Sequence, residues 1–277
     1  MPLLFLILFI YLFLFNNQIT SQLKIVNNLF FQTYIVSLFP FILFTNLVLK
    51  SNVIIDIHRF LTKKHCQFLF EILVIILTVL IGIPGNISLL NYLKDSNIIS
   101  NDEKQTYINY FGGISFPFIY LVILNECTKK IIIITLLIIV ETTIYYLNRT
   151  KRNYLTPCYK PTNISLIKKT SYSLLVVLFF LLTFSMLAIP FSSISYPYNY
   201  FFKSLIEFSY NLIILSKINS FLSNILIAIT ISFTSLSLIG QIKTIDSSFN
   251  IFEYIKKRAV VALYYLPILI LFLWNNQ

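Results

Sequence analysis

The chain has 277 residues, of which 57% are hydrophobic and only 11% are charged. These proportions exclude a soluble domain. The formal net charge is +11, but the basic residues lie in short connections between apolar runs, where the positive-inside bias would place them. They therefore do not indicate a nucleic-acid-binding surface. Since the runs approach helical span length and show no β-barrel alternation, the predicted fold is an all-α, polytopic helical membrane protein.

Residues 1–66 are predicted to form N-terminal membrane helices followed by a basic cytoplasmic loop. Residues 3–15 are apolar but lack a basic leader and a cleavage site, so an uncleaved helix is expected rather than a signal peptide. A second apolar run covers residues 29–49. The connection after it is predicted to be a cytoplasmic loop, because it contains four basic residues and a single acid. The basic residues are Lys50, Arg59, Lys63 and Lys64, and the acid is Asp56.

A third apolar run, residues 68–83, is predicted to cross the membrane and to stop at a break on the outer side. Proline removes a backbone donor and glycine adopts backbone angles that other residues avoid. The break is formed by Gly82, Pro84, Gly85 and the adjoining Asn86.

A polar helix is predicted after this break. Ser100 and Glu103 have the spacing of a capping box, which marks the start of a helix. Gly112 and Gly113 have the position of a C-terminal cap. This helix is followed by an apolar run at residues 114–124, about half the length needed to cross the bilayer.

A full span is expected at residues 131–147, which closes a first repeat over residues 67–147. Residues 148–172 form a second basic loop with six Lys or Arg and no acid, the strongest cytoplasmic signal in the chain. For both basic loops to lie inside, exactly one full crossing must separate the outer break from the second loop. Residues 114–124 therefore do not cross fully.

A second repeat is predicted over residues 173–277. Its apolar runs are residues 174–189, the half-length element 204–215, residues 225–239 and residues 259–274. With the basic loops on the inside, the order of spans places the N-terminus inside and the C-terminus outside. The predicted number of full spans is six to seven. A second break follows residue 233, with Ser235, Ser237 and Gln241 replacing glycine and proline, and Asn250 with Glu253 imitating a capping box.

Two broken regions facing opposite sides of the membrane are typical of inverted-repeat transporters. Irregular backbone at membrane depth is tolerated only where protein buries it or where it lines a wet cavity. The alternative is an ordinary outer loop with an amphipathic helix lying on the lipid headgroups.

The stretch "GIPGNISLLNYLKDSNIISNDEKQTYINYFGGISFPFIY" resembles, in order and spacing, the sporulation integral membrane protein family that carries the nucleoside-recognition, or gate, domain. "SLIEFSYNLIILSK" and "SFTSLSLIGQ" fall where that family has an acidic element and a second break. The matching residues are Gly82, Pro84, Glu207, Ser237 and Gln241. Departures include Ser88 in place of a basic residue and Ile239 in place of a histidine.

The resemblance implies a gate of small-residue breaks, and it supports Glu207 as a ligand-contacting or capping residue, with Asn211 nearby. Glu141 lies deep in an apolar run and is either a proton or cation site, a partner for a base, or an interfacial acid. Glu71 and Glu126 lie near span ends, where snorkelling explains them.

Metal, cofactor and enzymatic chemistry are not expected. The three cysteines are widely separated and form no CxxC or Cys/His cluster: Cys66, Cys127 and Cys158. His58 and His65 are predicted to be loop histidines that face anionic lipid. Motifs of soluble-type catalysis are missing. We therefore expect no cofactor and no enzyme.

Two functions fit these observations. The first is a transporter-like or gating protein of the cell membrane that binds or moves a small polar solute, which the resemblance links to sporulation and spore cortex formation. The second is a non-transporting scaffold that recruits partners or anionic lipid through its basic loops. Expected partners are the lipid bilayer and a polar solute, with a homo-oligomer left open, and no nucleic acid.

Overall fold

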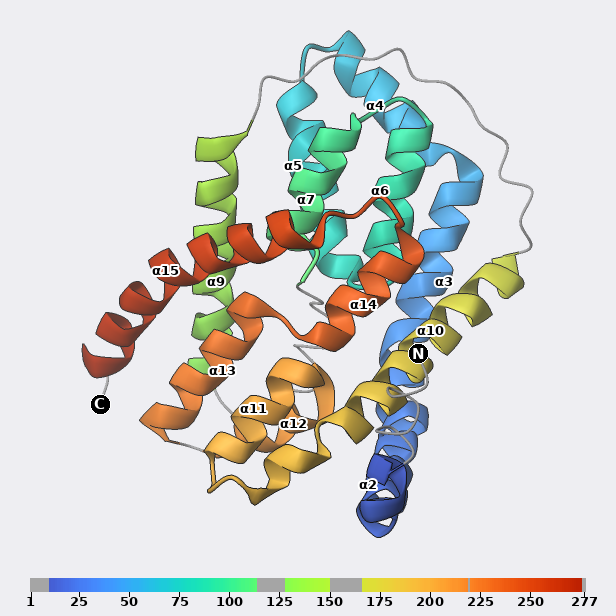
Figure 1. The fold of residues 1–277 in the computed structure, drawn as a ribbon. Coiled ribbons are helices and arrows are strands. Elements are labelled where there is room, and N and C mark those ends of the chain that lie inside the picture. The colour runs from blue at the N-terminus through green and yellow to red at the C-terminus, as the bar shows by residue number, and fades with distance from the viewer. Residues whose placement is uncertain (1–9, 114–127, 150–165, 219, 276–277) are drawn as a thin grey trace.

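The computed structural model describes residues 10–113, 128–149, 166–218 and 220–275, and within these ranges the chain forms helices and turns without a strand (Figure 1). The all-α prediction is confirmed. Residues 114–124 and Glu126 lie outside the described residues, as do Cys127, Cys158, most of residues 3–15 and most of the loop 148–172.

Four helical segments in the described ranges are long and apolar enough to cross a membrane: Asn16–Ser51, Lys168–Leu187, Phe221–Ile245 and Ile251–Trp274. Two shorter apolar helices cover Gln67–Ile81 and Ile132–Asn148. Fifteen helical residues span only about 22 Å, less than the roughly 30 Å of hydrocarbon in a bilayer. A multi-pass membrane protein is therefore supported, with four of the predicted spans of full length in the described residues.

The N-terminal span is longer than the sequence pattern predicts. Helix α2 (Asn16–Leu29), the π-helical turn η1 (Phe30–Tyr34) and α3 (Ile35–Ser51) follow one another without interruption. The polar residues of α2 continue the helix beyond the apolar run at residues 29–49. Asn52, in the left-handed region with φ 56°, ends this segment and starts the short helix α4 (Val53–Lys63).

Helices α5 (Gln67–Ile81) and α6 (Gly85–Asp95) form a hairpin with its tip at residues 82–84. Near the end of α6, Tyr92 Oη donates to Asn52 Oδ1 at 2.5 Å, so α6 ends beside the α3–α4 turn, at the same end of the molecule where α5 begins (Figure 1). The chain thus turns back at Gly82, whose φ is positive, instead of continuing as the predicted crossing.

Helix α7 (Asn101–Phe111) begins with the predicted capping box. Ser100 Oγ accepts the Glu103 N–H at 3.1 Å, and the Glu103 carboxylate accepts the Ser100 N–H at 2.7 Å. Gly112 is the C-cap of α7, as predicted, but neither Gly112 nor Gly113 adopts the left-handed conformation that usually favours glycine at a cap. A Cβ on Gly113 would lie 2.3 Å from Thr234 Cγ2, and one on Gly112 would lie 2.5 Å from the Ile108 carbonyl oxygen. Close packing requires these residues to be small.

The second half contains another hairpin of short helices. The first half ends with α9 (Thr128–Asn148), and the elements of the second half are α10 (Leu166–Leu187), the 3-10 turn η3 (Ile189–Ser193), α11 (Tyr198–Ile206), α12 (Phe208–Ser216), α13 (Phe221–Phe233), α14 (Leu236–Ile245) and α15 (Ile251–Asn275). Helices α11 and α12 turn at Glu207, and the two helices lie toward the end of the molecule opposite α4 (Figure 1). Thr234, also with positive φ, separates α13 from α14.

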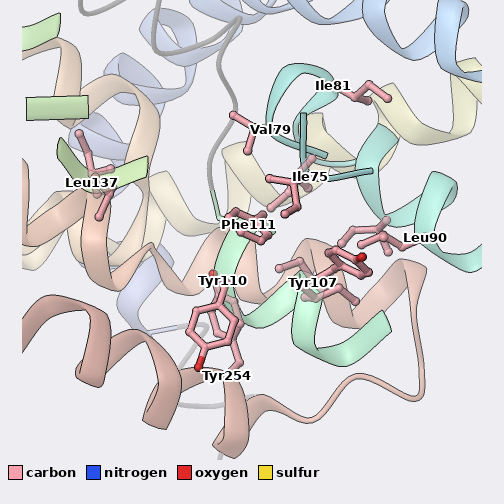
Figure 2. Packing of buried hydrophobic residues seen from close by; sticks show 14 of the residues in the cluster. Ile75, Val79, Ile81, Leu90, Tyr107, Tyr110, Phe111, Leu137 and Tyr254 are labelled. Carbon is pink, nitrogen blue, oxygen red and sulfur yellow. The ribbon is translucent and has the colours of Figure 1, made fainter. Parts of the chain in front are cut away.

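The apolar core fills the space between the first hairpin and the helices that follow it (Figure 2). Ile75 of α5 and Leu90 of α6 face Tyr107 and Phe111 of α7, and all four side chains are buried. Aromatic side chains on α7 are therefore enclosed by the protein.

Candidate functional site

A cavity lies where the tips of the two hairpins meet the breaks in the longer helices. Ile83 lines it from the first tip, and Glu207 and Ser209 line it from the second. Gly113 contributes the end of α7, and the start of α14 contributes Ser237 and Gln241. Residues that are far apart in sequence, such as Ile83 and Gln241, therefore share one site.

The remaining walls of this cavity are mainly apolar. Tyr34 and Leu38 come from the N-terminal helix, and Val177 and Leu181 come from α10. The cavity volume is about 40 Å³. On the same scale one water molecule needs roughly 10–15 Å³, so the cavity has room for about three waters. An apolar cavity with a few polar groups is the usual composition of a small-molecule site.

Glu207 is buried and serves as the N-cap of α12. Its carboxylate accepts the backbone N–H of Ser209 at 2.8 Å and of Tyr210 at 3.2 Å. These bonds satisfy donors at a helix start, where a negative charge is also favoured by the helix dipole. Of the two predicted roles, the structure thus shows the capping role.

Two predicted amide side chains each have a buried oxygen without a hydrogen-bond partner among the described residues. Asn86 donates to the Thr78 carbonyl at 3.4 Å, and Asn211 donates to the Glu207 carbonyl at 3.1 Å. Their Oδ1 atoms accept no bond in this part of the chain. Buried acceptors of this kind are costly unless water or a ligand satisfies them.

The second break is organised by serines. Ser235 Oγ accepts the Leu238 N–H at 3.3 Å and caps α14. Gln241 Nε2 donates to Ser237 Oγ at 3.5 Å, a long bond that leaves both side chains at the cavity wall. Ser235 therefore caps α14, whereas Ser237 and Gln241 line the cavity.

The structure brings four of the predicted site residues to the cavity: Gly113, Glu207, Ser237 and Gln241. Gly82, Pro84, Gly85 and Asn86 form and flank the first hairpin tip, next to Ile83. The other three pack beside these elements without lining the cavity: Gly112, Asn211 and Ser235.

A buried ion pair lies next to this site, and it confirms one of the alternatives predicted for Glu141, a partner for a base. Arg258 of α15 and Glu141 of α9 are both fully buried, and Arg258 Nη1 donates to Glu141 Oε1. The same guanidinium donates to three backbone carbonyls, those of Tyr110 at 3.0 Å, Ile231 at 3.0 Å and Ser232 at 2.6 Å. It therefore joins the C-terminal ends of α7 and α13.

Helix α7 also makes a series of polar contacts with the α14–α15 turn and with the start of α15. Lys104 Nζ lies 2.6 Å from Asp246 Oδ2, and both residues are buried. The Gln105 side chain pairs with the backbone of Asn250, accepting its N–H at 3.2 Å and donating to its carbonyl at 3.4 Å. The predicted capping box at Asn250 is only half formed. Glu253 donates its N–H to Asn250 Oδ1 at 3.2 Å, but its carboxylate accepts from Asn109 of α7 at 3.1 Å.

Glu71 does not snorkel, contrary to the prediction. It is buried near the start of α5, where it accepts Tyr145 Oη at 2.7 Å and Arg149 Nη1 at 2.6 Å. Both partners lie at the end of α9. The contact therefore connects the end of the first hairpin that lies opposite its tip to the end of α9.

The histidines show no arrangement of metal ligands. His58 packs edge-on against Phe70, with ring centroids 4.7 Å apart. Within the described ranges, no group of three or more His, Cys, Asp or Glu side chains is placed to hold a metal ion.

In comparisons with protein-family models, with curated proteins and with solved structures, no match to this chain was found.

Proposed function

We propose that the protein is a transporter-like membrane protein that binds a small polar solute in the cavity between the two hairpin tips. The observation that carries this proposal is the convergence of four separate breaks on one cavity. The tips at Ile83 and Glu207, the end of α7 at Gly113 and the start of α14 at Ser237 all line it.

The order of elements supports a repeated architecture. In each half a hairpin of short helices is followed by a short helix that ends at a break, and a long helix comes later in the chain. The first half has α5 and α6, then α7, then α9, and the second half has α11 and α12, then α13, then α15. The hairpins start from opposite ends of the molecule (Figure 1). We infer an inverted repeat in which Gly82 corresponds to the Glu207 turn and Gly113 to the Thr234 break. This pairing differs from the one that the sequence suggested, which compared the Gly82 break with the break at Ser235.

The re-entrant interpretation follows from helix length. Helices α5, α6, α11 and α12 are each too short to cross a bilayer alone. Their tips lie inside the protein, and broken backbone at membrane depth is tolerated where protein encloses it or where it lines a wet cavity. Both conditions favour binding at the tips.

The proposed location is the cell membrane, with the N-terminus inside and the C-terminus outside, on the basis of the basic loops. The link to sporulation and spore cortex formation rests on the family resemblance of residues 82–120 and of the second break. Deleting the gene in a spore-forming host, followed by measurement of cortex peptidoglycan, tests that link separately.

A cysteine reactivity experiment tests the wet cavity. In a background without native cysteines, Ser237→Cys is treated with a membrane-impermeant cationic thiosulfonate in sealed vesicles of both orientations. We expect slow but measurable labelling, protected by any solute that enters the site. The controls are Asp102→Cys, exposed at the start of α7, which should label quickly, and Leu263→Cys, 73% exposed on the apolar face of α15, which should not label.

The solute is sought with a thermal-shift panel of amino acids, polyols and nucleosides on the purified protein. A solute that raises the melting temperature of the parent protein, but not that of Gln241→Leu, identifies the substrate class. If Ser237→Cys is as inert as Leu263→Cys, the cavity is dry. The non-transporting scaffold then becomes the better interpretation.

A further inference from the structure

Arg258, Glu141 and the C-terminal ends of α7 and α13 meet in one buried cluster, here called the Arg258 joint, which carries an excess of negative charge. The last carbonyls of a helix lack intrahelical partners, and each C-terminal end carries about half a negative charge. The ends of α7 and α13 meet here, and Glu141 adds a full negative charge. Arg258 supplies one positive charge, so roughly one negative charge remains within a buried site.

Glu141 also has an unused acceptor. Its Oε1 atom is bonded to Arg258, whereas its Oε2 atom has no hydrogen-bond partner among the described residues. The side chain is fully buried, and a buried carboxylate oxygen without a donor is costly. A proton on Oε2 would remove the excess charge and turn the unpaired acceptor into a donor.

Among the described residues, the helices that pack against α9 bring no second cation to this charge. They are α7, α13 and α15. Besides Arg258, the titratable groups that they present near Glu141 are Tyr254 and Tyr265, which are neutral at ordinary pH. Helix α13 contributes backbone carbonyls. Glu71 of α5 meets α9 farther along, at Tyr145.

We propose that Glu141 is a proton-binding site, and that its protonation loosens the contact between α9 and Arg258, the residue of α15 that joins the ends of α7 and α13. The proton adds to Oε2, and Arg258 keeps its own proton. The pair then changes from neutral to a net charge of +1, so the attraction between Oε1 and the guanidinium falls. This inference deepens the proposed function, on which it rests, by assigning a coupling ion.

The joint borders the cavity. Gly113 lines the cavity, and a Cβ there would lie 2.9 Å from Tyr254 Oη. That hydroxyl is 3.0 Å from Thr234 Oγ1 at the α13–α14 break. Tyr254 precedes Arg258 by one helical turn. A change at Glu141 therefore has a short structural route to the cavity wall at Ser237.

The test measures how pH changes access to the cavity. Ser237→Cys and a reference, Asn101→Cys on the exposed start of α7, are labelled with membrane-permeant N-ethylmaleimide from about pH 8 to about pH 5. The ratio of the two rates cancels the ionisation of the thiol. We expect this ratio to rise at least about five-fold as the pH falls, the lower end of typical coupling between sites.

Variants at the pair separate gating from stability. Glu141→Gln imitates the protonated acid and should give a high ratio at every pH, whereas Glu141→Asp should retain the pH dependence. The double variant Glu141→Gln/Arg258→Gln, which leaves no unpaired buried charge, should also be pH-independent. Glu71→Gln, the matched buried acid of α5, should keep the parent profile.

A ratio that does not change with pH in the parent overturns the proposal. It is equally overturned if Glu141→Gln keeps the parent profile, or if Glu71→Gln abolishes it. Should neither Gln variant fold, the Glu141→Asp profile decides, because a shorter carboxylate must displace the midpoint if Glu141 is the group that titrates. This experiment contains no solute, so its result is independent of the solute tests described above. If the ratio depends on pH but no solute protects Ser237→Cys, the proposed function is contradicted and the proton site is retained.

Discussion

Thr234 adopts almost the same backbone conformation as Gly82. The backbone angles are φ 62° and ψ −179° at Thr234, and φ 68° and ψ 173° at Gly82. This region of backbone space is populated almost exclusively by glycine, and a β-branched residue in it is strained by about 1–3 kcal/mol. Each residue lies four positions after a buried threonine, Thr78 or Thr230, whose carbonyl accepts its N–H. The same geometry therefore breaks both helices.

Exchanging the residues at these two positions should have opposite effects. Gly82→Thr should lower the free energy of unfolding by about 1–3 kcal/mol, because threonine must adopt the strained angles. Thr234→Gly loses the hydrogen bond to Tyr254 but relieves strain, so its net change should stay within about 1 kcal/mol. Thermal unfolding in detergent measures both, with Ser88→Ala on α6 as the control. Equal losses at the two positions would contradict the strain argument.

Gly113 and Thr234 should be energetically coupled. Gly113→Ala places a methyl group 2.3 Å from Thr234 Cγ2 and should cost about 1–3 kcal/mol through overpacking. In the double variant with Thr234→Gly the obstructing side chain is gone, so most of that loss should disappear. A double-mutant cycle on unfolding free energies measures the coupling. Strictly additive losses would show that another atom sets the limit at Gly113.

Ser100→Ala should lower stability by about 1 kcal/mol, because the Glu103 N–H at the start of α7 loses its acceptor. Hydrogen exchange should accelerate in the first turn of α7 and remain unchanged in α15. Asn101→Ala, at an exposed position one residue later, is the matched control. Uniform acceleration across the whole protein would indicate global destabilisation instead of a lost cap.

Asp246 should make stability depend on pH under acidic conditions. Burial raises the pKa of its carboxyl, but hydrogen bonds from Lys104 and Ser248 and the charge of Lys104 outweigh this, so the pKa lies below its ordinary value. The stabilisation is therefore complete above the unfolded pKa of about 3.9 and is lost as pH falls through the folded pKa. Melting temperatures across an acidic pH series should show this loss, which Asp246→Asn should abolish.

Asp246→Asn should itself cost about 3–5 kcal/mol near neutral pH, because it leaves Lys104 buried without a counter-charge. Replacing both residues, as Lys104→Met/Asp246→Leu, should recover much of that loss. Recovery in the double variant separates the loss of an ion pair from damage to the α14–α15 turn. A double variant as unstable as the single one would contradict this account.

Local signals in the sequence were sufficient to predict several features of the site. The Ser100 cap depends on residues three positions apart, and the break at Gly82 depends on backbone preferences written into its own residues. Glu207 was recognisable because an acid within a short apolar element must find donors, and the donors are the adjacent backbone amides. Such features need no knowledge of distant contacts.

The remaining features depend on contacts between distant residues. Arg258 stands in a basic stretch beside Lys256 and Lys257, just before the predicted span at residues 259–274, and the positive-inside bias alone would place all three on a cytoplasmic flank. Only the packed helices show that Arg258 meets Glu141, 117 residues away, while its two neighbours remain at the surface or partly exposed. The turn of the first hairpin was missed for a related reason. Apolar content predicts that α5 enters the membrane, but only its contacts show that the chain returns.

The Arg258 joint has a consequence for how the protein is assembled in the membrane. Synthesis delivers Tyr110 and Glu141 long before α15, so the early helices enter the bilayer with a carboxylate and a helix end that lack their partner. A charged residue in a membrane helix costs about 2.5–3.5 kcal/mol on insertion scales, and insertion of Arg258 is eased when its acceptors are already present. Maturation of the first half is thus completed by the last described helix. A chain interrupted before α15 would present the quality-control machinery with an unfinished core.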